Sequence, residues 1–212
     1  EGRYSSKDAL ASEAIHIEQC VLREAVGVQD QISTAFGGFN YITFRRDGTY
    51  QIDPVILPRD RLKTLQDHLM LVFTGVSRIA AEVARTQIDN FKNRVTELRA
   101  VQQMVDQAIA ILTSPTTDLI EFGRLLHDAW MIKRTLSARV SNATVDHFYD
   151  AAIRAGAIGG KLLGAGGGGF MLLFVRPEHR ARVAAAFRDR TTVPVTFEPS
   201  GSRIVLYQPV GL

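Results

Sequence analysis

The chain of 212 residues is long enough for one large domain or two small ones. Its 25 Lys and Arg residues against 22 Asp and Glu give a formal charge of +3, and no basic run concentrates that charge, which argues against a nucleic-acid-binding surface. The apolar runs are far shorter than the roughly 20 residues of a membrane span, and the single cysteine, Cys20, excludes an internal disulfide or a zinc site with two cysteine ligands. Because the first residues show no basic-then-apolar signal pattern, we expect a cytoplasmic protein without a membrane partner.

Helical spacing of apolar residues predicts a first helix over residues 6–25, capped by Ser5 and Asp8 or by a neighbouring pair. Its expected buried face consists of Leu10, Ala14, Ile17, Val21, Leu22 and Ala25. Glu18 lies in the middle of this face, where a carboxylate is costly unless a cation or a hydrogen-bond donor meets it. A side chain that reaches solvent, or an ion pair with Arg23, would be a purely structural explanation.

The next part of the chain mixes short helices and strands. We expect a helix at 31–36, strands at 39–44 and 49–52, a loop between Pro54 and Pro58, and a buried strand at 68–74. Asp30 is a good cap for the short helix, which Gly37-Gly38 would end. Asp47-Gly48 is a strong hairpin signal between the first two strands.

The second half of the chain alternates long helices with strands. We expect a helix over 77–113 with a break near 86–90, a second helix capped by Asp118 and Glu121, and a third from 141 or 142 to 156. Strands are expected at 161–163 and 169–175. A helix over 177–188 and strands at 193–198 and 203–207 would follow. This order predicts an α+β fold in which helices cover one face of a mostly antiparallel sheet.

A glycine-rich segment is the most unusual feature of the sequence, because seven of the 17 glycines fall between Gly159 and Gly169. Its centre is Gly164, Ala165, Gly166, Gly167, Gly168 and Gly169. The pattern fits G-x-G-x-x-G, but it leads into a strand and not a helix, so it is not a dinucleotide-binding fingerprint. Such a backbone can adopt positive φ and leave N–H groups open to an anion. The structural alternative is a bulged β-arch packed against another backbone.

Two carboxylates are the other candidates for chemistry, since the five histidines form no H-E-x-x-H and no G-x-S-x-G elbow is present. Glu18 is out of place on an apolar face, and Asp30 stands at a helix start near glycines. A turn at Gly27 would allow both side chains to meet at one site.

Two segments carry a family resemblance. KLLGAGGGGFMLLF, residues 161–174, resembles the third signature of the GHMP kinases, and HIEQCVLREAVGVQDQISTAFGG, residues 16–38, is similar to the segment that holds the magnesium-binding Glu and the catalytic Asp of that superfamily. Within the superfamily, the sequences of these two segments and of residues 73–83 and 140–161 most resemble those of the bacterial D-glycero-D-manno-heptose 7-phosphate kinases. The resemblance runs nearly end to end.

The resemblance implies a GHMP-kinase-like α+β fold. Residues 1–60 would be the remainder of the N-terminal kinase domain and would carry both carboxylates, while residues 61–212 would be a C-terminal ferredoxin-like α/β sandwich with the glycine-rich loop. The second family signature, P-x-x-x-G-L-G-S-S-[AS], is absent. We therefore expect the chain to be the C-terminal two-thirds of such a kinase and to be inactive alone.

The resemblance also implies a function, namely an ATP-dependent kinase with Mg²⁺ as cofactor. It would phosphorylate the anomeric hydroxyl of a heptose 7-phosphate to the 1,7-bisphosphate, for nucleotide-activated heptose and surface polysaccharide synthesis. Asp30 would take or orient the proton of that hydroxyl, unless it is only a helix cap, and Glu18 would hold the Mg²⁺ that bridges the ATP phosphates. The loop from Gly164 to Gly169 would lie beside the transferring phosphate. The implied partners are ATP and a sugar or sugar phosphate, and an oligomer is compatible with the sequence.

Weaker substrate-binding candidates are Gly75, Arg78 and Lys161. Arg78 has two structural alternatives, as a helix cap or as a partner of Glu82, and the pair Lys133 and Arg134 is expected on a solvated helix face. Three other functions compete: a galactokinase or other sugar 1-kinase, a non-catalytic module that binds a sugar or a nucleotide, and a structural domain that mediates assembly.

Overall fold

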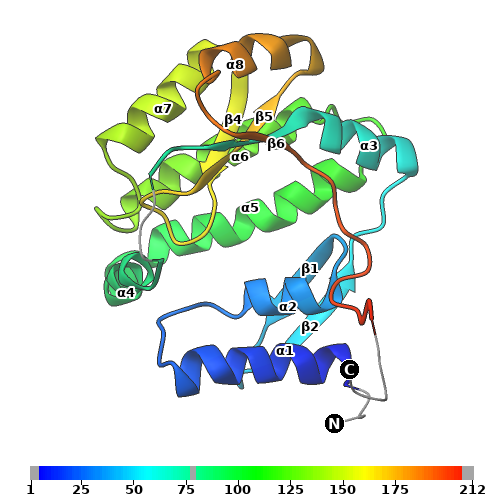
Figure 1. Ribbon diagram of the computed structural model, residues 1–212, viewed down its shortest axis with the longest axis vertical. Coiled ribbons are helices and arrows are strands. Elements are labelled where there is room, and N and C mark those ends of the chain that lie inside the picture. Colours follow the sequence, from blue (N-terminus) through cyan, green and yellow to red (C-terminus); the bar gives the residue numbers. More distant parts are fainter. Residues whose placement is uncertain (1–4, 77–79, 207–212) are drawn as a thin grey trace. The chain divides into compact units, whose positions relative to one another are not determined.

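The structure is a computed structural model that describes residues 5–76 and 80–206 (Figure 1). The chain divides into two units, residues 1–56 with 197–212 and residues 57–196. The chain thus returns to the first unit at Phe197. The expected division near residue 60 had placed this C-terminal segment in the second domain. The functional division into two kinase domains stays a prediction.

The first unit begins with helix α1 (Lys7–His16), which Ser6 caps by accepting a hydrogen bond from the Ala9 N–H at 3.1 Å. The helix widens into a π-helical turn, η1 (Ile17–Val21), and ends there, before the predicted end at residue 25. Helix α2 (Gln29–Phe36) follows, and then the antiparallel hairpin of β1 (Asn40–Phe44) and β2 (Tyr50–Pro54). The predicted hairpin turn is confirmed, with Gly48 at φ +84°.

The buried face of α1 differs from the predicted stripe. Ala11 is the buried residue of this helix, and it packs with Ile32 and Ala35 of α2. The predicted face is wrong at four of its six members, because Leu10, Ile17, Val21 and Leu22 are exposed. The contact with α2 selects a different side of α1 because small side chains allow the two helices to approach closely.

The C-terminal segment is held against the end of α2 within the same unit. The Gly38 N–H donates to the Glu198 carbonyl at 2.6 Å and the Ser202 N–H to the Thr34 carbonyl at 2.9 Å. Lys7 Nζ donates to the carbonyls of both Phe36 and Ser200. The predicted strand at 203–207 is wrong over residues 203–206, which form no strand, and its last residue lies outside the described residues.

The second unit contains the remaining elements in the order α3 (Arg59–His68), β3 (Leu69–Phe73), α4 (Ala80–Asn90), η2 (Phe91–Asn93), α5 (Val95–Thr113), α6 (Ile120–Thr135), α7 (Ala143–Arg154), β4 (Ala157–Leu162), β5 (Phe170–Val175), η3 (Pro177–His179), α8 (Arg180–Ala186) and β6 (Thr192–Pro194). Helix α3 was not expected from the sequence. The predicted break in the long helix exists, but it lies at 91–94, about one turn later than predicted.

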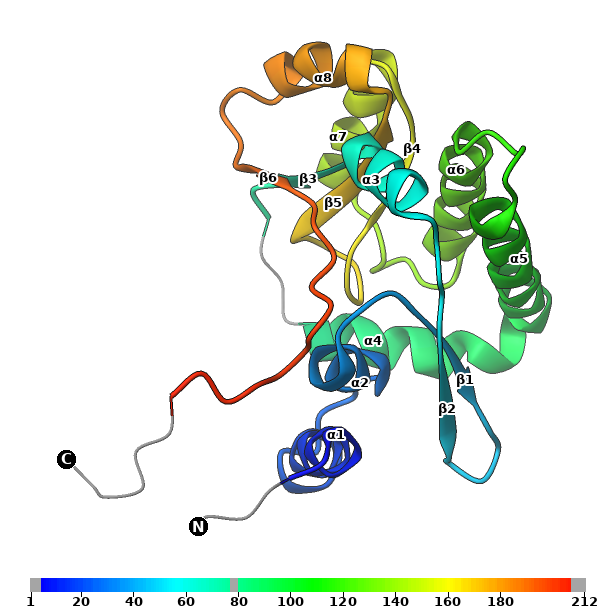
Figure 2. The ribbon, with the colours of Figure 1, turned by 90° about the vertical axis from the view of Figure 1, so that its right-hand side faces the viewer.

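Four strands form one antiparallel sheet in the order β4-β5-β3-β6. With β3 first in the chain, this is the strand arrangement of the ferredoxin-like β-α-β-β-α-β motif, so the predicted fold class is confirmed. Helices cover both faces, and the expectation of one covered face is wrong. Leu173 belongs to the core cluster that includes residues of α7 and α8, whereas the ring of its neighbour Phe174 lies against that of Phe122 on α6. Figure 2 shows α7 and α6 on opposite sides of β4.

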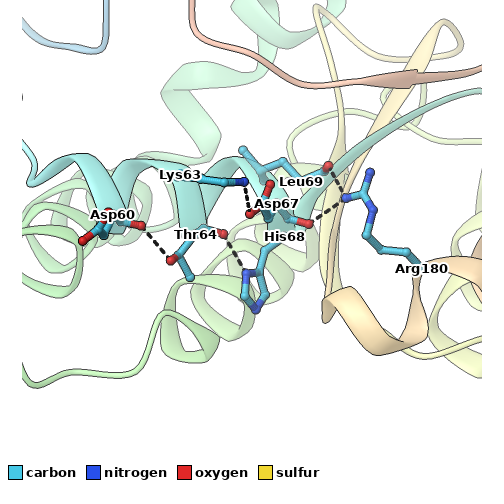
Figure 3. Close-up of polar contacts among 7 residues, drawn as sticks. All are labelled: Asp60, Lys63, Thr64, Asp67, His68, Leu69 and Arg180. Carbon is cyan, nitrogen blue, oxygen red and sulfur yellow. Dashed lines mark hydrogen bonds and ion pairs between the residues drawn. The ribbon is translucent and has the colours of Figure 1, made fainter.

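The connection from α3 to β3 has no loop, so the carbonyl groups at the junction need partners from elsewhere in the unit. Arg180, from the start of α8, donates to the carbonyls of Asp67 at 2.8 Å and Leu69 at 2.7 Å (Figure 3). On the helix itself, Lys63 pairs with Asp67 at 2.7 Å. The Arg180 contacts therefore fix the start of the central strand relative to α8.

A second arginine closes the end of α5, and its removal gives a testable prediction. Arg61 of α3 donates to the carbonyls of Ile111 and Leu112 at 2.6 Å and of Thr117 at 2.9 Å. Hydrogen bonds from a charged donor are stronger than neutral ones, so Arg61→Ala is expected to lower the free energy of unfolding by about 2–3 kcal/mol. Urea unfolding measures this, with an unchanged m-value as evidence of an intact fold.

The control for this prediction is Arg59→Ala, on the same helix and at an exposed position. It should change the free energy of unfolding by about 0.5 kcal/mol or less. Equal effects of the two substitutions would contradict the role assigned to the Arg61 contacts.

Candidate active site

Glu18 lies in the π-helical turn η1 and is half-buried. Its carboxylate accepts a hydrogen bond at 2.5 Å from Nε2 of Gln31, in the first turn of α2. No ion pair joins Glu18 to Arg23 among the described residues, so that structural explanation is wrong. The carboxylate on the apolar face is stabilised by an amide from the neighbouring helix.

Asp30 precedes Gln31 and is exposed. Helix α2 begins one residue earlier than predicted and is preceded by Val28, so Asp30 lies inside the first turn and is not its cap. Among the described residues, the Asp30 carboxylate has no hydrogen bond or ion pair. The partial positive charge at a helix start stabilises such a carboxylate. The Glu18–Gln31 hydrogen bond thus joins the two segments that hold the predicted carboxylates.

The donor set beside Glu18 fits Mg²⁺. Only one of the two Glu18 oxygens accepts the Gln31 hydrogen bond, and Oε1 of Gln31 is buried with no partner among the described residues. No group of three or more His, Cys, Asp or Glu side chains that could hold a metal occurs in the described part of the chain. Mg²⁺ in phosphoryl-transfer sites is held by one or two carboxylates together with substrate phosphates, so one carboxylate is sufficient protein charge.

The glycine-rich loop connects β4 and β5 in the second unit. Gly164, Gly166, Gly167 and Gly169 all have positive φ, between +69° and +122°. A Cβ at Gly166 would lie 2.7 Å from the Val140 carbonyl oxygen, and residues other than glycine are therefore excluded there. The loop packs against another backbone, as the structural alternative predicted, but it is a hairpin connection between paired strands and not an arch. This packing does not use all of its N–H groups.

The N–H groups of the loop divide into two sets. Those of Gly167 and Gly169 donate to the carbonyls of Val140 at 2.9 Å and Val76 at 2.7 Å. Those of Ala165, Gly166 and Gly168 donate to no carbonyl of the described residues. The adjacent N–H groups of Ala165 and Gly166 are therefore available to an anion, as in other concave backbone anion sites.

Three side chains, two on helices and one at a helix cap, fix the loop, and the sequence analysis predicted none of these contacts. Gln87 of α4 donates to the Ala165 carbonyl at 2.6 Å, Asn142 before α7 to the Gly167 carbonyl at 3.0 Å, and Lys133 of α6 to the Gly164 carbonyl at 2.7 Å. Lys133 is half-buried on α6 and its contact with the loop is exposed, so it reaches the loop from a helix face that is in part solvated, as expected.

The second unit also contains a pocket of about 360 Å³, lined by Met131, Arg134, Thr135, Ser137, Ala138, Ser141 and Asp146. Its one arginine is already paired, because Arg134 contacts Asp146 at 2.9 Å. Arg134 therefore does not lie on a free solvated face. The compensated charges do not favour an anionic ligand in this cavity.

Two of the three weaker substrate-binding candidates, Gly75 and Lys161, lie within the described residues. Gly75 has φ +79°, and the Arg190 guanidinium occupies the space of its missing Cβ. Lys161 lies on β4, opposite Leu172 of β5. Arg78 lies outside the described residues, and Glu82, its alternative partner, has Arg139 at 3.8 Å.

Comparison with known families identifies the second unit. Residues 104–191, which include the glycine-rich loop, match the family of the GHMP kinases C terminal. The chain contains a GHMP kinase C-terminal domain. In this GHMP kinase domain the loop between β4 and β5 stands where the sequence resemblance expected the third family signature. No helix in the described ranges is both long and apolar enough to cross a membrane.

Similarity to curated proteins extends beyond residues 104–191. The GHMP kinase chain is 30% identical over 183 residues to the D-glycero-alpha-D-manno-heptose 7-phosphate kinase of Campylobacter jejuni, covering 84% of this chain and 53% of that protein. It is 26% identical over 184 residues to the bifunctional fucokinase/GDP-fucose pyrophosphorylase of Arabidopsis thaliana, covering 84% of this chain and 17% of that protein. The chain therefore spans about half the length of the first of these relatives and less of the second.

A solved structure agrees with these relatives. The crystal structure of a D-glycero-D-manno-heptose 1-phosphate kinase from Bacteroides thetaiotaomicron is similar with a TM-score of 0.62 and 25% identity. The similarity covers 92% of this chain and 54% of that chain. It thus includes residues of both units and not the C-terminal domain alone.

Proposed function

We propose that the protein that contains this chain is an ATP-dependent sugar kinase and that it phosphorylates the anomeric hydroxyl of a heptose 7-phosphate to the 1,7-bisphosphate. The observation that supports this most is the unpartnered Asp30 carboxylate, which lies in the same helical turn as Gln31, the residue whose amide holds the Glu18 carboxylate. The name of the Campylobacter relative supports the substrate class. Such a kinase would work in the cytoplasm, where ATP is available, and its product would serve the synthesis of nucleotide-activated heptose.

In the proposed reaction, the sugar oxygen forms a bond to the γ-phosphorus while the bond from that phosphorus to the ADP oxygen breaks. The hydroxyl proton passes to the Asp30 carboxylate, or is oriented by it, as the nucleophile attacks. Glu18 would be the carboxylate ligand of Mg²⁺, which neutralises phosphate charge when bound. The free N–H groups at Ala165, Gly166 and Gly168 would donate to phosphate oxygens. Gly75, Arg78 and Lys161 stay proposed substrate contacts.

The relatives differ in the sugar that they name, which makes a substrate panel the direct test. We expect the full-length protein to release ADP with heptose 7-phosphate at a kcat/KM about 10- to 100-fold above that with heptose, fucose or galactose. One phosphate held by charged donors supplies a difference of that order. The position of the new phosphate is read by ³¹P NMR.

Preference for fucose or galactose would support the second candidate, another sugar 1-kinase, which the fucokinase relative favours. Nucleotide binding without phosphate transfer to any sugar of the panel would contradict a kinase and favour a binding module. Residues 1–212 alone are expected to show no turnover in the same assay, since the chain spans 53% of its Campylobacter relative.

A further inference from the structure

We infer that Gln31 is a positioning residue, which holds the Glu18 carboxylate in the orientation that binds the metal of the nucleotide. This inference rests on the proposed function, because it concerns the role of Glu18 in that reaction. It starts from one contact between residues 13 positions apart, the hydrogen bond from Gln31 Nε2 to Glu18 Oε2.

The chemistry of this contact favours a positioning role over a merely structural one. The amide must turn its NH₂ group to the carboxylate, because the opposite orientation would set two acceptors against each other. A neutral donor leaves the negative charge of Glu18 in place, whereas an ion pair with a lysine or arginine would cancel the charge that a cation needs. One Glu18 oxygen is thereby fixed and the other is left for a ligand.

The other end of the same amide gives an independent observation. Oε1 of Gln31 is buried and accepts no hydrogen bond from the described residues. Buried acceptors are almost always satisfied, so an unpartnered one calls for an explanation. Mg²⁺ keeps several of its waters when it binds to proteins, and one of them could donate to this oxygen after a small shift of the side chain opens it to water.

The place of Gln31 in the chain extends this argument to Asp30. Both residues lie in the first turn of α2, so the hydrogen bond ties the turn that holds Glu18 to the turn that holds the proposed proton acceptor. Groups that orient a metal ligand typically change metal affinity about 10- to 100-fold when they are removed. A stabilising contact elsewhere in the unit would not affect the metal selectively.

The test measures metal binding directly in the full-length protein. Binding of Mn²⁺ in the presence of ADP is followed by electron paramagnetic resonance for Gln31→Met and Gln31→Leu. Both substitutions remove the amide donor, and they replace it with apolar side chains of two different shapes. We expect the dissociation constant of Mn²⁺ to rise about 10-fold or more in both. Gln29→Met, an exposed position in the same turn, is the matched control and should leave Mn²⁺ binding unchanged.

Glu18→Gln separates the inference from the proposed function. If Glu18→Gln weakens Mn²⁺ binding and both Gln31 variants bind it like the wild type, the positioning role is wrong while the proposed metal ligand stands. If Glu18→Gln itself has no effect on the Mn²⁺ titration, the metal role of Glu18 is wrong and the inference fails with it. Thermal unfolding of each variant, within a few degrees of the wild type, excludes loss of the fold as the cause.

Discussion

Asp30→Asn is expected to lower kcat of the full-length protein with its best sugar by about 10²- to 10⁴-fold, the usual contribution of a positioned general base. An amide has nearly the shape of the carboxylate but cannot take the hydroxyl proton. Because the Asp30 side chain has no partner among the described residues, its replacement breaks no contact of the fold. Binding of the sugar, measured by calorimetry, should change by less than about 3-fold.

Asp8→Asn is the control for this substitution, since Asp8 is also exposed and lies in the first turn of α1. Both variants lose a small favourable interaction with a helix dipole, about 0.3–1 kcal/mol, so a general effect of charge or stability would appear in both. Near-normal turnover of Asp30→Asn would remove Asp30 from the catalytic role. Equal losses in the two variants would attribute the effect to stability and not to proton transfer.

The candidate carboxylates could be found from the sequence because their signals are local. Glu18 stands on an apolar face, and Asp30 stands near a helix start beside glycines. The partner that explains Glu18 could not be found in the same way, because Gln31 reaches it only when α1 and α2 pack together. The nearer Arg23 was the wrong choice, since the π-helical turn η1 changes the angular positions of side chains relative to a regular helix.

The fold was predictable where a turn or a cap decides the structure. The Asp47-Gly48 hairpin and the cap at Asn142 follow from the backbone preferences of single residues.

That helices cover the second face of the sheet was not predicted, for a different reason. Gly159 and Gly160 look like loop residues, but in β4 the missing side chain of Gly159 lets α6 approach through Gly123. Close packing between distant glycines has no local signature.

The same limit applies to the end of the chain. The apolar residues Ile204, Val205 and Leu206 predicted a strand, but all three are exposed. The preceding residues 197–202 are fixed instead by polar contacts, which include two backbone hydrogen bonds to the end of α2 and the contact of Lys7 with the Ser200 carbonyl. A hydrophobic pattern depends on side chains alone, so it gives no signal for hydrogen bonds made by the backbone.

Gly37→Ala is expected to destabilise the first unit by about 3 kcal/mol or more, the largest effect on stability that we predict. Gly37 has φ +67° with ψ −177°, a region that is essentially restricted to glycine and costs other residues about 1–3 kcal/mol. A Cβ there would also overlap the backbone of Gly201, which has φ +65° itself. The close approach of these two glycines permits the Gly38–Glu198 and Ser202–Thr34 hydrogen bonds.

Gly48→Ala separates the two contributions, because Gly48 has a similar φ of +84° but open space within 4 Å of its missing Cβ. It should lose only the conformational part, about 1–2 kcal/mol. Amide hydrogen exchange measures both variants in the unit itself: faster exchange at Gly38 and Ser202 is expected for Gly37→Ala and not for Gly48→Ala. Similar exchange at these two amides in both variants would mean that the glycine contact does not hold the C-terminal segment, and that strain at a positive φ alone accounts for the loss of stability.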